Sequence, residues 1–272
     1  MDKKYPPIPA AVFTAIYTGD LKRLDSLYKP GISLEAIARH SAKAEKPEVL
    51  EWCYSKGWAH PTGDTVNDRF YLAAICNGTP EFFQVLLNHG FDIDSHFTTT
   101  LGDALASAVI FDHHDLAKWL LEHGHNPNPF EPLYGGCSIE STVRGETASI
   151  SMLKALLDHG FKLKEYGAAI AAADEGNLEA LKMLLAHGGF DIDETVMWWY
   201  PFDITKDEPE ESKGTALYRA CRQGHVECAA LLLEHGADPK AKDLGGVSCL
   251  QIAREREHED VVELLLSKGV TE

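Results

Sequence analysis

The stretch "KGTALYRACRQGHVECAALLLEHGADPKAKD", residues 213–243, decides the fold of this 272-residue chain. An alanine-bearing segment comes first, a break at Gly224 follows, and leucines then recur at helical spacing as far as Gly236. Alanine favours a helix and lets that helix lie close against its neighbours. A glycine after the last leucine suits the left-handed position that ends many helices. The stretch therefore predicts two short helices joined by a tight turn.

The same pattern returns along the whole chain. Its closing motif, "LLxHG" or a weaker copy, ends at eight glycines: Gly31, Gly57, Gly90, Gly124, Gly160, Gly188, Gly236 and Gly269. Because 33 residues separate Gly57 from Gly90 and Gly236 from Gly269, the period is near that length. A helix pair of this size cannot bury its own apolar face and must stack on copies of itself. We therefore expect an all-α solenoid of stacked helix–turn–helix units.

Residues 213–243, and "GGVSCLQIAREREHEDVVELLLSKG" at 245–269, resemble the ankyrin repeat. The consensus positions filled in the first stretch are Thr215, Leu217, Gly224, His225, the leucines at 231–233, Gly236, Ala237 and Asp238. The resemblance covers the chain as about eight repeats in a single array over residues 1–272. Their approximate bounds are 8–31, 32–57, 58–90, 91–124, 125–160, 161–188, 189–236 and 237–269. It implies a curved solenoid with hairpin fingers and inner helices that line a concave binding face, and it does not indicate the ligand.

Composition narrows the class of partner. The chain has 42 acidic and 25 basic residues, a net charge of −17, which repels phosphate backbones and argues against nucleic acid as a partner. No stretch approaches 18 apolar residues, which argues against a membrane span. The six cysteines form no CxxC pair and fit neither a zinc site nor a secreted disulfide framework. We expect a cytoplasmic protein, with the nucleus as the alternative, that needs no cofactor.

The thirteen histidines invite a metal or general-base interpretation. Five share one slot, directly before the closing glycine: His89, His123, His159, His187 and His235. A residue that recurs once per repeat serves the repeat, so we expect these side chains to hydrogen-bond near the helix end. In "DHHD" (112–115) two adjacent imidazoles diverge by about 100° on a helix and cannot bind one ion from one face. Their register also places them at a turn, where helix N-caps belong, and we predict no metal site.

The register of the repeats also predicts where two tryptophans and two pairs of aspartates lie. Trp52 and Trp119 occupy the first position of the leucine run, and we predict that both pack in the core. The motif "FDID" occurs at 91–94 and 190–193, in finger segments where turn-forming aspartates are expected. Motifs such as GxSxG, HExxH and GxxxxGK[ST] are absent from the sequence, so no catalytic residue is assigned.

Two departures from the period locate a candidate site. Only 7 residues separate Gly160 from Gly167, too few for a hairpin finger, whereas 27 separate Gly188 from Thr215. The longer gap holds "DETVMWWYPFDITKDEPEES" (193–212), so the sequence predicts an enlarged finger at 189–214.

Aromatic side chains mark this enlarged finger and a proline-rich finger at 125–138. They are Trp198, Trp199, Tyr200, Phe130 and Tyr134. Because helix layers stack about 8–10 Å apart, the two fingers should stand ~16–20 Å apart with no finger between them. We call this predicted gap the notch and predict that it is the main ligand site. An alternative is that the insertion folds over its own scaffold and buries these rings.

The ankyrin resemblance implies that the two residues before each inter-helix glycine face the concave groove. Around the notch these are Asp174, Glu175, Arg222, Gln223, Ile110 and Phe111. Together with the five aromatic residues, they form the predicted partner-binding set.

Three functions of different classes fit this prediction. The leading one is a non-catalytic protein-binding adaptor or scaffold, whose acidic charge favours a basic or amphipathic segment. The second is an enzyme or small-molecule binder with a pocket between fingers 125–138 and 189–214, where Asp174, Glu175 and Asp203 serve as acid–base groups on a cationic substrate. The third is self-assembly, against which the charged residues at 255–260 argue because they predict a polar cap and a monomer.

Overall fold

The computed structural model describes residues 8–60, 69–76, 79–92, 94, 103–128, 139, 142–144, 149–164, 166–195, 214–243 and 245–271. The chain divides into two compact units, residues 1–129 and 130–272, and each is described by itself. Apart from one antiparallel bridge between Lys242 and Ser248, the regular structure of the described residues is helical. The prediction of an all-α fold is confirmed, and the prediction of one continuous array stays a prediction.

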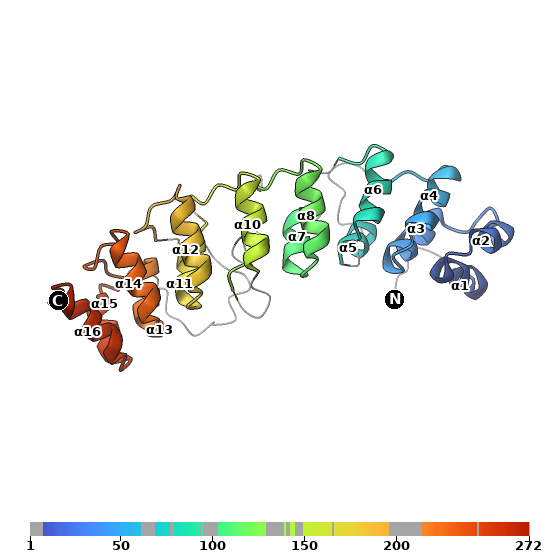
Figure 1. Ribbon diagram of the computed structural model, residues 1–272. Coiled ribbons are helices and arrows are strands. Elements are labelled where there is room, and N and C mark those ends of the chain that lie inside the picture. Colours follow the sequence, from blue (N-terminus) through green and yellow to red (C-terminus); the bar gives the residue numbers. More distant parts are fainter. Residues whose placement is uncertain are drawn as a thin grey trace. The chain divides into compact units, whose positions relative to one another are not determined.

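The described helices of the first unit follow one another in pairs (Figure 1). The pairs are α1 (Ala10–Thr18) with α2 (Leu21–Leu27), α3 (Leu34–Lys43) with α4 (Pro47–Ser55), α5 (Arg69–Cys76) with α6 (Pro80–Asn88), and α7 (Ala104–Ile110) with α8 (His114–Glu122). The helices that the structure describes with their bounds in the second unit are α10 (Ile150–Asp158), α11 (Ala168–Asp174) with α12 (Leu178–His187), α13 (Ala216–Gln223) with α14 (Val226–Glu234), and α15 (Cys249–Glu255) with α16 (Glu259–Ser267).

Helices of the same kind pack in rows within each unit. In the first unit α1, α3, α5 and α7 form an inner row, and α2, α4, α6 and α8 form an outer row. In the second unit α11, α13 and α15 form the inner row, and α10, α12, α14 and α16 form the outer row. Each unit is therefore two layers of helices, as expected for stacked helix–turn–helix repeats.

Side chains at the ends of the inner helices set where each helix starts and stops. The Thr215 Oγ1 atom accepts a hydrogen bond from Tyr218 N at 3.2 Å and so caps the start of α13. The helix ends at Gly224, whose φ of 81° lies in the left-handed region that glycine adopts without strain. Glu257 holds the equivalent position after α15 with a φ of 62°. The turn geometry is thus kept even where glycine is replaced.

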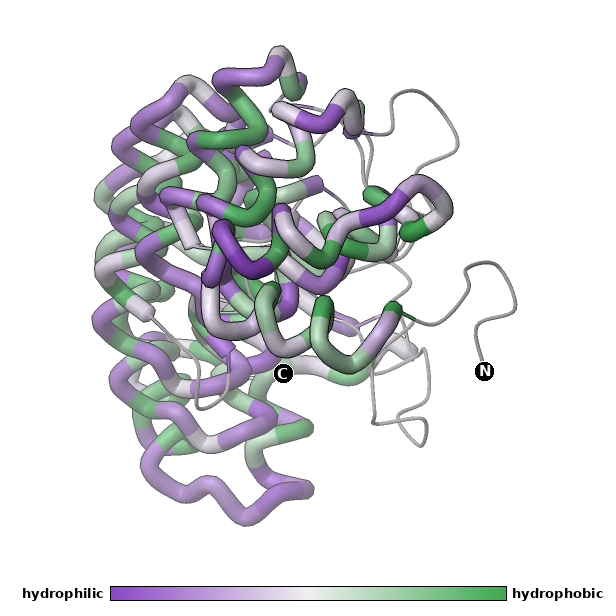
Figure 2. The backbone as a smooth tube through the Cα atoms, turned by 90° about the vertical axis from the view of Figure 1, so that its right-hand side faces the viewer, coloured by the Kyte–Doolittle hydropathy of each residue, from purple (hydrophilic) through white to green (hydrophobic). Residues whose placement is uncertain are grey.

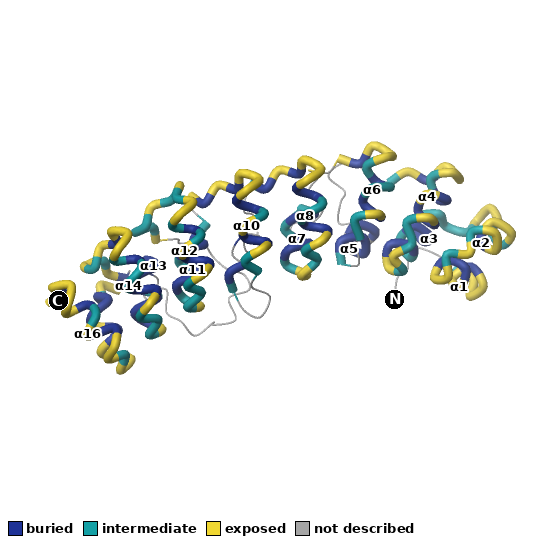
Figure 3. The backbone as a smooth tube through the Cα atoms, viewed as in Figure 1, coloured by how far each residue is buried: buried dark blue, intermediate teal, exposed yellow. Residues whose placement is uncertain are grey.

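Small side chains let the inner helices approach one another. On α11 five alanines, at 168, 169, 171, 172 and 173, are 3% exposed or less. Leucines fill the outer row, and Leu181 and Leu232 are fully buried. Exposed residues gather at the helix ends and the turns, whereas buried residues line the helix contacts (Figure 3). Figure 2 shows that hydrophobic and hydrophilic residues are interleaved along the described helices.

Three of the five histidines in the closing slot make the predicted hydrogen bond near the helix end. Their Nδ1 atoms donate to backbone oxygens four residues earlier: His123 to Trp119 O at 2.8 Å, His159 to Ala155 O at 2.8 Å and His235 to Leu231 O at 2.9 Å. His187 contacts Gly188 O at 3.2 Å, and His89 instead lies 3.0 Å from the carboxylate of Glu51.

The two tryptophans assigned to the core differ. Trp52 is 8% exposed, and its indole Nε1 donates to Asp25 Oδ1 at 3.2 Å, so its core assignment is confirmed. Trp119 is half-buried and stacks on His123 with ring centroids 3.9 Å apart, so its assignment to the core was too simple. The equivalent positions Val85 and Leu231 are also half-buried, because this column lies at the edge of the outer layer.

Among the described residues, no helix has both the length and the apolar content that a membrane span requires.

Candidate functional site

Neighbouring repeats are tied together at the ends of the inner helices. The imidazole Nε2 of a histidine at the start of an outer helix donates to a backbone oxygen at the end of the inner helix of the preceding repeat. The three pairs are His113 with Cys76 O at 2.9 Å, His225 with Asp174 O at 3.0 Å and His258 with Arg222 O at 3.0 Å. In the sixth repeat Asn177 takes this place, and its Nδ2 donates to Val143 O at 3.3 Å. Of the predicted groove-facing residues, Asp174 and Arg222 therefore have their backbone oxygens held by the following repeat.

Asp174 lies at the centre of a polar cluster in the second unit. Arg219 donates to its carboxylate from Nε at 2.7 Å and from Nη2 at 3.0 Å. Gln223 Nε2 adds a third hydrogen bond at 3.0 Å, and Arg144 Nη2 lies 3.8 Å away. The side chains of Asp174 and Arg219 are only 8% and 13% exposed. Both carboxylate oxygens are thus engaged by a charged, bidentate partner.

The predicted groove-facing residues separate into buried and exposed ones. Glu175 and Gln223 are exposed at the ends of α11 and α13, whereas Arg222 is only 7% exposed. Of the pairs among these residues, the structure joins Asp174 and Gln223 through their hydrogen bond.

The other predicted residues cannot be joined to this cluster. Ile110 is half-buried and Phe111 is 38% exposed, and both belong to the first unit. The five aromatic residues of the notch (Trp198, Trp199, Tyr200, Phe130 and Tyr134) lie outside the described residues, as does Asp203. Their part in binding stays a prediction.

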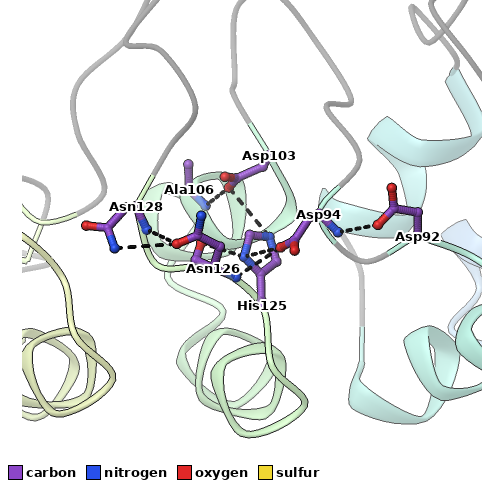
Figure 4. A network of polar contacts seen from close by, with 7 residues as sticks. All are labelled: Asp92, Asp94, Asp103, Ala106, His125, Asn126 and Asn128. Carbon is purple, nitrogen blue, oxygen red and sulfur yellow. Dashed lines mark hydrogen bonds and ion pairs between the residues drawn. The ribbon is translucent and has the colours of Figure 1, made fainter.

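The two "FDID" motifs link successive fingers in the same way. In the first motif the Asp94 carboxylate accepts a hydrogen bond from Asn126 N at 2.9 Å (Figure 4). In the second, the Asp193 carboxylate accepts from Asp238 N at 3.0 and 3.2 Å. The first aspartate of each motif closes a local turn, because Asp92 accepts from Asp94 N and Asp191 from Asp193 N. The prediction of turn-forming aspartates is confirmed.

This second link spans the enlarged finger. The bonded residues are 45 apart in the sequence, against 32 in the first unit, because the insertion lies between them. On one side of the insertion Asp193 keeps the usual contact, and on the other Thr215 caps α13 as usual. The extra residues are thus accommodated without displacing the repeat frame.

A buried imidazole accompanies the first finger link. The His125 side chain is 1% exposed and lies between Asp94 and Asp103 (Figure 4). Its Nδ1 donates to Asn126 O at 2.9 Å and lies 3.4 Å from Asp94 Oδ1, and its Nε2 lies 3.9 Å from Asp103 Oδ1. Asp103 also caps α7 by accepting from Ala106 N at 2.8 Å. This group holds the finger against the start of the helix.

A matching buried group supports the last finger. Tyr218 is 1% exposed, and its hydroxyl donates to Asp243 Oδ2 at 2.8 Å. Burial, and then the neighbouring carboxylate, raise the pKa of Tyr218. The other oxygen of Asp243 accepts from Val247 N at 2.7 Å and so shapes the turn of the finger.

These contacts limit the chemistry of the cluster. Both oxygens of the Asp174 carboxylate accept hydrogen bonds from Arg219, so this side chain serves to join two repeats. In the "DHHD" segment His113 contacts Cys76 O and His114 pairs with Asp112 Oδ1 at 3.1 Å, so the two imidazoles diverge as predicted. Across the described ranges, no three His, Cys, Asp or Glu side chains come together as ligands for a metal ion.

Sequence reasoning missed Arg219 and the histidines that join repeats. The histidine signal was available, because His113, His225 and His258 each follow an inter-helix turn residue. Arg219 gave no such signal, since its partner Asp174 lies in the preceding repeat.

Comparisons with known proteins agree with this architecture. The family model described as ankyrin repeats (3 copies) matches residues 39–131 and 194–271. A solved ankyrin repeat domain from Acinetobacter baumannii AYE aligns with a TM-score of 0.57 and 26% identity, over 74% of this chain and 99% of that one. The potassium channel AKT1 of Arabidopsis thaliana is 32% identical over 100 residues, which are 37% of this chain and 10% of the channel.

A further relative matches a longer part of this chain. It is the ankyrin repeat and KH domain-containing protein CBG24701 of Caenorhabditis briggsae, 26% identical over 205 residues, 74% of this chain and 7% of its own length. The chain thus spans a tenth or less of both curated relatives. The family match covers more than half of the chain and agrees with the stacked helix pairs, the glycine turns and the linked fingers. The chain belongs to the ankyrin-repeat family.

Proposed function

We propose that the chain is a non-catalytic protein-binding adaptor or scaffold that uses its concave face and the enlarged finger at 189–214. Ankyrin repeats are in general protein-interaction modules, which supports the broad class. The observation that carries the proposal is the intact repeat frame on both sides of the insertion, at Asp193 and at Thr215. An insertion that leaves the packing of its scaffold unchanged is free to serve recognition.

The ends of the inner helices supply the second part of the surface. Glu175 and Gln223 are exposed beside Asp174, which Arg219 holds in place. A partner would meet Gln223 already hydrogen-bonded to Asp174, which lowers the entropic cost of binding at this position. The net charge of −17 favours a basic or amphipathic segment as the partner.

Trp198, Trp199 and Tyr200 are the strongest candidates for binding hot spots. Tryptophan and tyrosine provide a large contact area at a low cost in rotamer entropy. We propose that they contact the partner together with Phe130 and Tyr134, and that Asp174, Glu175, Arg222, Gln223, Ile110 and Phe111 form the groove beside them. The proposal places a monomeric protein in the cytoplasm or the nucleus.

Affinity capture with three variants tests the proposal. We expect Trp198→Ala/Trp199→Ala to lose captured partners, and Glu175→Ala/Gln223→Ala to weaken their capture. Ser267→Ala, on the outer helix α16, is the matched control and should capture the same proteins as the wild type. Thermal unfolding of each variant should stay within a few degrees of the wild type, which corresponds to about 1 kcal/mol or less.

Two results would contradict the proposal. If all variants capture the same proteins, neither the finger nor the helix ends bind the partner. If the double tryptophan variant unfolds or aggregates, the rings belong to the core, as in the alternative in which the insertion packs on its scaffold. Size-exclusion chromatography with light scattering tests the monomeric state.

A further inference from the structure

One polar side chain occupies a core position that apolar side chains fill elsewhere in the chain. The position directly follows the closing glycine of a repeat, and after Gly124 it holds His125, which is 3% exposed. After five other closing glycines it holds an apolar residue that is 8% exposed or less: Trp58, Phe91, Phe161, Ala237 and Val270. Because an apolar side chain is enough to fill this part of the core, the imidazole needs an explanation other than packing.

The two ring nitrogens of His125 have different surroundings. The Nδ1 atom lies 2.9 Å from the backbone oxygen of Asn126, and because a carbonyl oxygen only accepts, this nitrogen carries a hydrogen. In the neutral ring the Nε2 atom is therefore an acceptor. It is buried and makes no hydrogen bond with any described residue. A buried acceptor that lacks a donor is unfavourable, so the neutral ring does not satisfy its own site.

The polar atom that faces Nε2 is also an acceptor. Asp103 Oδ1 lies 3.9 Å from Nε2, which is beyond hydrogen-bond distance, and the side chain of Asp103 is 13% exposed. On the other side of the ring, Asp94 Oδ1 lies 3.4 Å from Nδ1 (Figure 4). A proton from solvent on Nε2 would turn two facing acceptors into a donor and an acceptor, and would place a cation between two carboxylates.

The other charged groups around His125 do not oppose this effect. On the finger segment Asp92 accepts from Asp94 N and adds negative charge. The last titratable side chains of α8 and its end, Glu122 and His123, are exposed, and His123 stacks on Trp119. Across the described ranges, neither Asp94 nor Asp103 forms an ion pair with a lysine or an arginine. Their charge is therefore available to a protonated imidazole.

Both carboxylates also hold the finger in place. Asp94 accepts the first finger link from Asn126 N at 2.9 Å, and Asp103 caps α7 by accepting from Ala106 N at 2.8 Å. We propose that His125 is a pH-sensitive switch, in which protonation of Nε2 forms a hydrogen bond to Asp103 and tightens the base of the finger that begins at residue 125. This inference goes beyond the proposed function, because it concerns the order of the finger and needs no partner.

Amide hydrogen exchange of the full chain, followed by NMR, tests this inference with a control in the same molecule. The Asp238 amide makes the matching bond to Asp193 at 3.0 Å, but Ala237 stands in the place of His125. We expect the protection of the Asn126 amide, corrected for its intrinsic exchange rate, to rise by about threefold or more between pH 7 and pH 5, as for one added hydrogen bond. The protection of the Asp238 amide should not rise.

Three variants separate a switch from a merely structural role. His125→Phe places in this position the residue type that Phe91 and Phe161 have there, and it should abolish the rise. Asp103→Asn keeps a side-chain oxygen for the cap of α7 but removes the charge, and it should reduce the rise. Asp115→Asn, which removes an exposed carboxylate from α8, is the matched control and should keep the rise of the wild type.

Several outcomes would overturn the inference. The ring has no such role if protection does not rise in the wild type, if it rises equally at Asn126 and Asp238, or if the rise persists in His125→Phe. An unchanged rise in Asp103→Asn would show that Asp103 is not the acceptor. NMR of nitrogen-15-labelled histidine keeps the test decisive if His125→Phe fails to fold, because an Nε2 atom whose protonation does not change between pH 7 and pH 5 excludes the switch. The proposed function is tested separately, through capture by the tryptophan variants.

Discussion

Arg219 of one repeat holds both carboxylate oxygens of Asp174 in the preceding repeat through hydrogen bonds of 2.7 and 3.0 Å. Both side chains are largely shielded from water, so removing one of them would leave the charge of the other poorly compensated. It joins the end of α11, two residues before Gly176, to the middle of α13. The stability of the repeat stack and the order of the proposed binding surface therefore depend on the same contact.

Loss of this pair should destabilise the second unit. Among the described residues, Arg219→Ala leaves Gln223 and the more distant Arg144 beside the shielded Asp174 carboxylate, and we expect a loss of about 2–3 kcal/mol in the free energy of unfolding. Urea denaturation followed by circular dichroism measures the loss. Glu175→Gln changes an exposed neighbour and should stay within about 0.5 kcal/mol of the wild type. Equal losses in the two variants would show that the pair adds nothing.

The turn glycines should differ in their tolerance of alanine. Gly176 has a φ of 68°, and a Cβ atom there would meet the His225 ring at 2.6 Å. Gly160 has a φ of 87°, but a Cβ atom there would meet nothing within 4 Å. Gly160→Ala should therefore cost about 1 kcal/mol through backbone strain alone, and Gly176→Ala should cost at least about 1 kcal/mol more. Thermal unfolding of both variants checks the order, and a greater loss in Gly160→Ala would refute this explanation.

The hydroxyl of Tyr218 should contribute to the stability of the fold through its hydrogen bond to Asp243. In Tyr218→Phe the packing stays, but Asp243 loses a 2.8 Å hydrogen bond in a buried place. An unsatisfied buried acceptor costs about 1–3 kcal/mol. The double variant Tyr218→Phe/Asp243→Asn provides the cycle that separates the pair energy from the other contacts of Asp243. No coupling in that cycle would mean that the hydroxyl is replaced by water.

Stability should fall on mild acidification, and His60 should account for part of this. Burial, and then His89, lower the pKa of His60 below its usual 6.5, and its neutral Nδ1 accepts a hydrogen bond from the Tyr54 hydroxyl at 2.8 Å. Because the unfolded chain then binds the proton more readily, this contribution is complete above pH 6.5 and is lost as the pH falls towards the folded-state pKa. The slope for one proton is at most about 1.4 kcal/mol per pH unit.

Denaturation curves between pH 7 and pH 5 measure this effect. His60→Asn should flatten the dependence, whereas Ser267→Ala, at an exposed position on α16 that carries no titratable group, should keep the slope of the wild type. His40, whose pKa is also lowered by burial, contributes with the same sign, so His40→Gln/His60→Asn should flatten the curve further. A slope that is unchanged in the double variant would show that other groups cause the loss.

Much of the fold could be predicted because its determinants are local. The caps at Thr215 and Ser248, the turn at Gly224 and the leucine runs all act within one repeat, and the structure has them where the period places them. The half-buried position of Trp119 could not be predicted in this way, because periodicity identifies the apolar face of a helix but not the edge of that face. Trp119 lies at this edge, half-exposed against His123.

Less of the candidate site could be predicted, because it depends on contacts between repeats. The sequence shows that Asp174 stands before a turn, but not that Arg219 occupies its carboxylate from 45 residues away. Nor does the sequence distinguish Gln223, which is exposed, from Arg222, which is buried beside it. Such differences arise from the packing of α13 against α11 and α15, and no single repeat contains them.

The bond from His225 to the oxygen of Asp174 also determines how these repeats can be exchanged. The side chain that completes a turn is encoded in the following repeat, so a segment cut from glycine to glycine leaves its last turn without its donor. A transplanted module should therefore extend past its own end to include the next histidine, or Asn177 where that residue takes its place. Recombination at the closing glycine should yield chimaeras that are destabilised at the junction, because the hydrogen bond to the turn is lost. Recombination inside an outer helix, after this donor, should keep the hydrogen bond and the stability.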